Sequence, residues 1–154
     1  MFSDNGAART GFHDPICSIC SWGTETGAHD ATLDGHTCLF LGLAVHGDRL
    51  FSASNDGTIR VWALGTWAAL HTVGAGAEEW GKCPLCLVVS GRHLVSGSVG
   101  YGSQEVRVRD LKTLELQHTR PQPSSGLGVR ALLAVKGTVW AGVGQDVVVW
   151  VRGV

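Results

Sequence analysis

The chain has 154 residues, of which 44% are hydrophobic and 16% charged, a composition typical of one folded domain rather than of a disordered chain. Its formal net charge is −1, so it lacks the basic excess that binding to nucleic acid or to an anionic membrane usually requires. No apolar run approaches the ~20 residues of a membrane span, and the first residues do not have the pattern of a secretory signal. Five cysteines, an odd number, favour reduced thiols and a location in the cytoplasm or the nucleus.

Residues 1–30 show no sustained hydrophobic period, and we expect this segment to be irregular. Its one motif is the CxxC of Cys17 and Cys20, and a second CxxC spans Cys83–Cys86. Tetrahedral zinc is usually bound by two such pairs about 12–20 residues apart, and these two are much further apart. We therefore expect no metal and no cofactor. The alternative is a zinc site that uses Cys17 and Cys20.

The stretch Leu50–Trp62 predicts a β-hairpin, because β-prone residues flank the turn sequence Asn55-Asp56-Gly57. Gly35-His36 precedes Trp62 by about the distance expected within one four-stranded repeat unit. The order of these features, a Gly-His pair, Ser-x-x-x-Asp-Gly and a terminal Trp, resembles the WD repeat of β-propellers. Ala63 stands where the Asp of the WD pair is expected.

The same pattern then returns twice, which predicts three antiparallel blades at about 34–72, 83–118 and 128–151. In the first blade the four strands are expected at Phe40–Val45, Arg49–Ser54, Thr58–Trp62 and Trp67–Thr72. The sequences Leu43-Ala44-Val45, Leu87-Val88-Val89 and Leu133-Ala134-Val135 align these blades, with steps of 44 and 46 residues between the valines. The expected fold is therefore all-β, with a WD-type propeller portion over residues 31–154.

This propeller is expected to be incomplete. Ala31–Leu33 resembles the last strand of a blade, whereas the third blade has no fourth strand before Val154. Rings of this kind need about 4–8 blades, so three are too few. Either the chain is a portion of a longer protein, or two copies form a homodimeric ring in which each Ala31–Leu33 strand completes the partner's third blade.

Four residues match the hydrogen-bonded tetrad of WD blades. The resemblance implies that Trp62 donates to Ser52, that Ser52 bonds to His36, and that Asp56 orients His36. A Ser-His-Asp set also occurs in hydrolases, but a catalytic serine must be exposed, and we expect Ser52 to be buried inside a blade. In the second blade Arg109 replaces the tryptophan. In the third blade Trp150 keeps that position, whereas Ala141 lies near the serine position.

The irregular segments around the second blade are the expected partner-binding region, because loops on a rigid scaffold commonly carry recognition. They contain an aromatic and charged set that is typical of protein interfaces, namely Trp80, Tyr101, Glu78, Glu79 and Lys82. The alternative is that Trp80 folds back onto the core.

The sequence thus predicts a non-catalytic scaffold that binds other proteins or peptides. The sequence is similar to the WD tails of ubiquitin ligases, kinases and zinc-finger proteins. Two further hypotheses are a zinc-binding or ligase-associated module that uses the N-terminal CxxC, and a hydrolase that uses Ser52 and His36.

Overall fold

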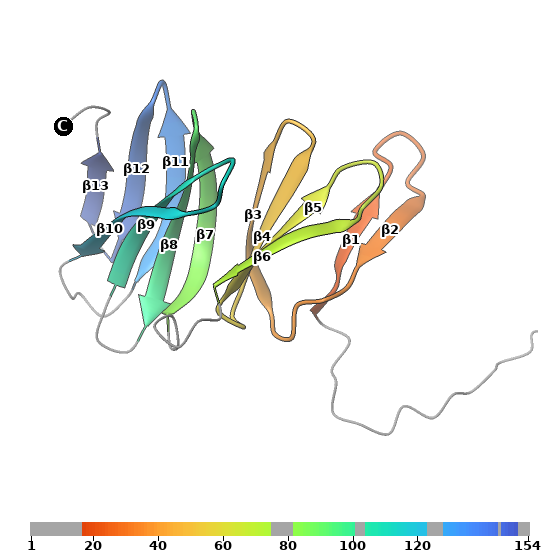
Figure 1. Cartoon of the computed structure of the whole chain (residues 1–154), viewed down its shortest axis with the longest axis horizontal. Helices are drawn as coiled ribbons and strands as arrows, with labels where there is room; N and C mark the ends of the chain where they lie inside the picture. Colours follow the sequence, from red (N-terminus) through yellow and green to blue (C-terminus); the bar gives the residue numbers. More distant parts are fainter. Residues whose placement is uncertain (1–16, 75–81, 101–103, 123–127, 145, 151–154) are drawn as a thin grey trace, which may run out of the picture.

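The structure is a computed structural model, and it describes residues 17–74, 82–100, 104–122, 128–144 and 146–150. These residues form thirteen β-strands in four antiparallel sheets (Figure 1). The strands are β1 (Ile19–Trp22), β2 (His29–Leu33), β3 (Phe40–His46), β4 (Arg49–Ser54), β5 (Thr58–Ala63), β6 (Ala69–Gly74), β7 (Lys82–Ser90), β8 (His93–Gly100), β9 (Gln104–Asp110), β10 (Leu116–Gln122), β11 (Val129–Val135), β12 (Thr138–Val143) and β13 (Asp146–Trp150). None of the described residues belongs to a helix long and apolar enough to cross a bilayer.

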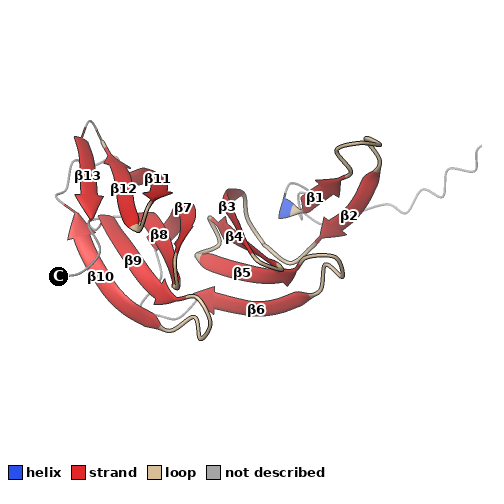
Figure 2. Cartoon of the chain, turned by 90° about the horizontal axis from the view of Figure 1, so that it is seen from above, coloured by secondary structure: helices blue, strands red, loops and turns tan. Residues whose placement is uncertain are grey.

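The four sheets stand side by side along an arc (Figures 1 and 2). They are an N-terminal sheet of β1 and β2, blade 1 of β3–β6, blade 2 of β7–β10 and blade 3 of β11–β13. Strands β3, β7 and β11 line the inner side of the arc, whereas β6 and β10 form its outer side (Figure 2). The all-β class and the blade architecture expected from the sequence are confirmed, and the propeller is not closed.

The strand registers correct the alignment of blade 3. Val45 pairs with Leu50, Val89 with Leu94, and Ala134 with Val139, so each first hairpin encloses four residues. The residue equivalent to Val45 and Val89 is therefore Ala134, not Val135, and the steps are 44 and 45 residues. The sequence alignment matched residue types, but a slip of one residue turns a side chain to the opposite face of a sheet. Only the registers reveal this.

The prediction that residues 1–30 are irregular is wrong for β1. Its pairing with β2 repeats that of β5 with β6, because Ile19 faces Leu33 as Ile59 faces Val73. Both pairs also shift register just before a tryptophan, Trp22 in β1 and Trp62 in β5. The N-terminal sheet is therefore the third and fourth strands of a further blade. Ala31–Leu33 is a fourth strand, as expected, but β1 is already paired with it.

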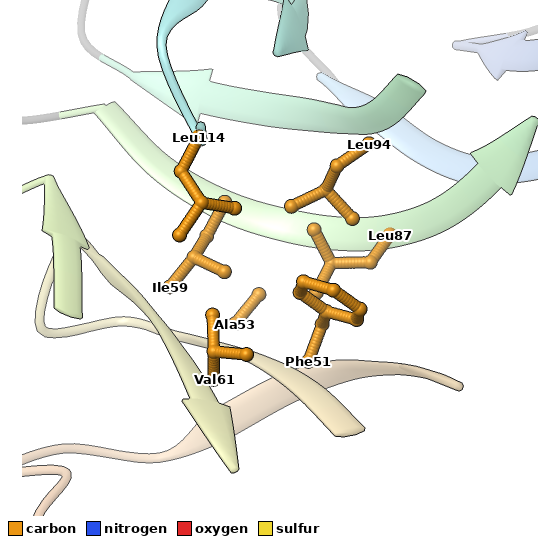
Figure 3. Close-up of a cluster of buried hydrophobic side chains, with 7 residues drawn as sticks. All are labelled: Phe51, Ala53, Ile59, Val61, Leu87, Leu94 and Leu114. Atoms are coloured by element: carbon orange, nitrogen blue, oxygen red, sulfur yellow. The ribbon is translucent and has the colours of Figure 1, made fainter. Parts of the chain in front are cut away.

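Hydrophobic cores lie between the sheets, since successive side chains of a strand point to opposite faces. Between blades 1 and 2, Phe51 and Val61 meet Leu87 and Leu94 from the facing sheet (Figure 3). A second core joins blades 2 and 3, and a third joins the N-terminal sheet to blade 1. Each blade thus buries an apolar face that it could not bury alone.

Gly97 is required by the close approach of blades 2 and 3. A Cβ at this position would lie 2.5 Å from Val129 Cγ1 and 2.7 Å from Cys86 Sγ. We expect Gly97→Ala to lower the free energy of unfolding by about 1–3 kcal/mol, as overpacked cores do. Urea denaturation measures this loss.

Gly142 is the matched control, because its register places it at the equivalent position of blade 3. A Cβ there would meet only Ala131 Cβ, at 3.7 Å. Gly142→Ala is therefore expected to leave stability unchanged or slightly raised. Equal losses in the two variants would contradict a tight contact at Gly97.

Candidate functional site

The structure brings the four tetrad residues of blade 1 into one chain of hydrogen bonds. Trp62 Nε1 donates to Ser52 Oγ over 2.9 Å, and Ser52 Oγ lies 2.8 Å from His36 Nε2. His36 Nδ1 lies 2.8 Å from Asp56 Oδ2. Because the carboxylate can only accept, His36 Nδ1 carries a proton and donates to Asp56. In the tautomer with the proton on Nδ1, the Ser52 hydroxyl donates to Nε2. Every polar group in this chain of contacts has a partner.

Local sequence explains how His36 reaches this position. Ser52 and Trp62 lie on one face of adjacent strands, and His36 comes from the segment between β2 and β3. Gly35 precedes it with φ +146°, and a Cβ on Gly35 would lie 2.5 Å from Arg60 Nη1. The glycine of the Gly-His pair is therefore required mainly by this positive φ, because the end of the Arg60 side chain could move aside.

Asp56 joins the tetrad to the β4–β5 turn. Its Oδ1 accepts from the backbone N–H of Thr58 at 2.8 Å and from the Thr58 hydroxyl at 2.6 Å. Its Oδ2 accepts from the backbone N–H of Thr37 at 3.0 Å. Burial alone would raise the pKa of Asp56, but these bonds and that from His36 outweigh it and lower the pKa to about 2.

This low pKa predicts an acid-dependent loss of stability. The depressed folded-state pKa means that Asp56 contributes its stability above pH ~4, and that the contribution is lost as the pH falls through about 2. We expect Asp56→Asn to be less stable than the natural protein at pH 6, with the difference shrinking between pH 4 and 2. Urea unfolding at each pH measures it.

Asp48 is exposed and serves as the control position for this titration. Asp48→Asn should differ little from the natural protein over the whole pH range. A stability difference for Asp56→Asn that stays constant down to pH 2 would show that the carboxylate of Asp56 is not held ionised in the fold.

The Ser-His-Asp geometry resembles a catalytic triad, but the serine is inaccessible. Ser52 has a relative exposure of 0% and His36 one of 6%. A nucleophilic serine must reach a substrate, and Ser52 Oγ instead accepts from Trp62 within the blade. The arrangement can link two strands, a turn and the segment 34–39 into one rigid unit.

Blades 2 and 3 depart from this pattern, as the sequence predicts. In blade 2, Ser96 is buried, and Arg109 Nη1 donates to the carbonyl of Leu114 at 3.4 Å. In blade 3, Ala141 pairs with Val148 as Ser52 pairs with Arg60. Alanine has no hydroxyl, so blade 3 cannot form the Ser–Trp bond.

The two CxxC pairs are not brought together: Cys17 precedes β1, whereas Cys83 lies on β7 of another sheet. Cys20 is exposed on β1, whereas Cys86 packs against the core between blades 2 and 3. Among the residues that the structure describes, no three His, Cys, Asp or Glu side chains are grouped to hold a metal ion.

Cys86 and Cys20 are expected to differ strongly in reactivity. Burial raises the pKa of the Cys86 thiol to about 11, against the opposing effect of the hydrogen bond with Gly97. Because the thiolate is the reactive form, we expect iodoacetamide at pH 8 to modify Cys86 on the order of a hundredfold more slowly than Cys20. Peptide mass spectrometry over time measures both rates. Equal rates in the folded protein would contradict the burial of Cys86, and unfolding in urea should bring the rates together.

Most of the expected partner-binding residues, Trp80, Tyr101, Glu78 and Glu79, lie outside the described residues. Lys82 is the first residue of β7, and it pairs with Gly100, the last residue of β8. Lys82 directly follows residues 75–81 and Gly100 directly precedes residues 101–103, and these two flanking residues are adjacent. The role of these residues stays a prediction.

A groove between blades 1 and 2 was not foreseen from the sequence. It has a volume of about 840 Å³ and is formed by the β3–β4, β7–β8 and β9–β10 turns. Its charged lining residues are His46, Asp48, Arg49, Arg92, Asp110 and Lys112. Asp110 accepts from Arg92 over 3.3 Å. The three cations Arg49, Arg92 and Lys112 exceed the two carboxylates of Asp48 and Asp110 by one positive charge.

Neither a family model nor a curated protein sequence matches the chain. Solved structures do. The structure of U3-55K and that of the RRP9 WD40 repeats each match with a TM-score of 0.74 and 22% identity, over 88% of this chain and 42% of theirs. The computationally designed protein Ika4 matches with a TM-score of 0.68 and 27% identity, over 88% of this chain and 80% of its own.

The chain thus has the fold of WD40-type propeller blades, which confirms the resemblance seen in blade 1. It spans about two fifths of the length of the two WD40 chains, 42% of each. This likeness concerns the fold alone, and a fold does not by itself identify a function.

Proposed function

We propose that the protein is a non-catalytic WD-repeat scaffold that binds other proteins or peptides, and that it acts neither on nucleic acid nor at a membrane. The observation that supports this most directly is the buried tetrad. The side chains most able to perform chemistry, Ser52 and His36, have 0% and 6% exposure and use their polar atoms to hold blade 1 together. The surface is then left for recognition.

We place one peptide-binding surface in the groove between blades 1 and 2. Its surplus of one positive charge favours peptides that carry carboxylates. A peptide-display library selected on the immobilised protein should yield acidic sequences, with affinities measured by calorimetry on synthetic peptides. Arg49→Ala combined with Lys112→Ala should weaken these peptides at least about tenfold, as the loss of charge-assisted contacts does.

Arg120 and Lys136 are exposed cations outside the groove, so their double alanine variant is the matched control. It has the same net charge as the groove variant and should bind as the natural protein does. Equal weakening in both variants would show that the peptides bind through the overall charge of the protein and not through the groove. Failure to select any peptide would contradict the proposed scaffold function.

The hydrolase hypothesis rests on the Ser52–His36–Asp56 geometry, and it has a separate test. A fluorophosphonate probe labels serine nucleophiles that are accessible and activated. We expect no labelling of Ser52 in the folded protein. Labelling that disappears in Ser52→Ala would instead support the hydrolase.

A further inference from the structure

The last sheet of the arc exposes a face that the preceding blades bury. In blade 3 this face, here called the tail face, consists of Leu133, Trp140, Val147 and Val149, which are 40–67% exposed. By register, Trp140 and Val149 pair as Phe51 and Val61 do in blade 1. Phe51 and Val61 have 0% exposure, because blade 2 covers them. The tail face therefore has the composition of a blade-to-blade contact without the covering blade.

The opposite end of the arc exposes the complementary positions. Leu43 and Val45, here called the head face, are 47% and 59% exposed on β3. Their equivalents in blade 2 are Leu87 and Val89, which pack against blade 1. Among the described residues, the N-terminal sheet has the third and fourth strands of its blade. It covers Leu50 and Trp62, whereas the head face is exposed.

We propose that the tail face of one copy of this chain docks on the head face of a second copy, as blade 1 docks on blade 2. The contact between blades 1 and 2 is established within the chain, and it uses the equivalent positions on both sides. The chain therefore carries both halves of this contact on its two ends. Two copies related in this way close a ring with three blades from each.

In this docking, β13 of one copy must displace β1 of the other copy. Both are the third strand of a blade, and they would occupy the same place beside β2. Gly142 pairs with Val147 as Ala53 pairs with Ile59, and Ile19 repeats the position of Ile59. Val147 and Val149 of one copy thus replace Ile19 and Ser21 of the other beside β2. Strand β2 then becomes the missing fourth strand of blade 3, and β1 is released. The exchange favours β13, since Val149 is apolar where β1 has Ser21.

Sedimentation equilibrium of the full chain over a range of concentrations tests the proposal. The natural protein should form dimers of twice the 16.2 kDa chain mass. Trp140→Ser on the tail face and Leu43→Ser on the head face should each raise the dissociation constant at least tenfold. Ile19→Ser should lower it, because that variant weakens the strand that β13 replaces. Leu116→Ser is the matched control, since Leu116 is 45% exposed but lies on β10, outside both faces.

Mixing the two weakened variants tests the head-to-tail geometry. Each variant alone forms a ring with two substituted contacts. The mixed dimer has one intact contact, between the head face of Trp140→Ser and the tail face of Leu43→Ser, and one contact that carries both substitutions. Because a second substitution in a contact that is already broken costs little, the mixture should associate more tightly than either variant alone. A folded natural protein that stays monomeric would overturn the proposal and leave an additional chain segment or a different protein as the occupant. Weakening by Trp140→Ser without weakening by Leu43→Ser would also overturn it, in favour of tail-to-tail contact. Neither face includes a groove residue, so these results do not depend on the proposed peptide binding.

Discussion

Replacing Phe51 with alanine is expected to lower the free energy of unfolding by about 3–5 kcal/mol, the range measured for large aromatic side chains in protein cores. Phe51 has 0% exposure and packs with Val61 of its own blade and Leu87 and Leu94 of the next (Figure 3). The substitution removes buried apolar contacts from the core. It also leaves a cavity, because the two sheets relax only partly around the smaller side chain. Urea denaturation followed by tryptophan fluorescence measures the loss.

Phe40→Ala is the matched control for this experiment, because Phe40 is 36% exposed on the neighbouring strand β3. It removes the same number of atoms from a position that is already partly in water, so we expect a clearly smaller loss. Equal losses in the two variants would mean that Phe51 is not at the centre of a core between blades.

Replacing His36 with alanine is expected to be the most damaging polar substitution in blade 1. It leaves the Ser52 hydroxyl and one oxygen of Asp56 without the imidazole, and each buried polar group left unpaired costs about 1–3 kcal/mol. The segment 34–39 also loses the side chain that bridges Asp56 and Ser52, and it keeps only bonds such as that from the Thr37 N–H to Asp56. Thermal and urea unfolding should both report the change.

His71 is exposed on β6 of the same blade, so His71→Ala is the control that alters one histidine without touching the tetrad. It should unfold as the natural protein does. An unchanged melting temperature for His36→Ala would show that the hydrogen bonds of the tetrad contribute no net stability, and the structural role assigned to them would then be wrong.

The repeat in the sequence was sufficient to predict most of the fold. The β4–β5 hairpin follows from the Asn55-Asp56-Gly57 turn between two β-prone segments, and the strands expected at Arg49–Ser54 and Thr58–Trp62 agree with β4 and β5 to within one residue. The grouping of His36, Ser52, Asp56 and Trp62 followed from one motif, because a WD repeat fixes their order along the chain.

Two local signals were misjudged. Strand β1 has no Gly-His pair before it, and its four residues Ile19–Trp22 follow a segment without periodicity. Its tryptophan at the end of a short strand, as in β5, was the signal that could have identified it. The slip at Val135 arose because Leu-Ala-Val matches in type, whereas the register depends on which residues pair across the first hairpin.

The groove could not be predicted from the sequence, and neither could the particular residues that the two open ends of the arc expose. The groove is assembled from three turns that are remote in the chain, including those at Gly91-Arg92 and Asp110–Thr113. The sequence of the tail face predicts an ordinary buried strand, because Val147 and Val149 are apolar and two residues apart, as Ile59 and Val61 are. Whether such a face is covered depends on the neighbouring sheet, which composition and periodicity do not specify.

Residue-resolved hydrogen exchange on Phe51→Ala tests most directly whether consecutive sheets share their cores. The variant changes only blade 1, but Leu87 and Leu94 of blade 2 contact the same core. We expect amide protection to fall in β7 and β8 as well as in β4 and β5, with β11 and β12 affected less. Loss of protection confined to β3–β6 would contradict the account, because it would show that the blades fold and open independently of one another.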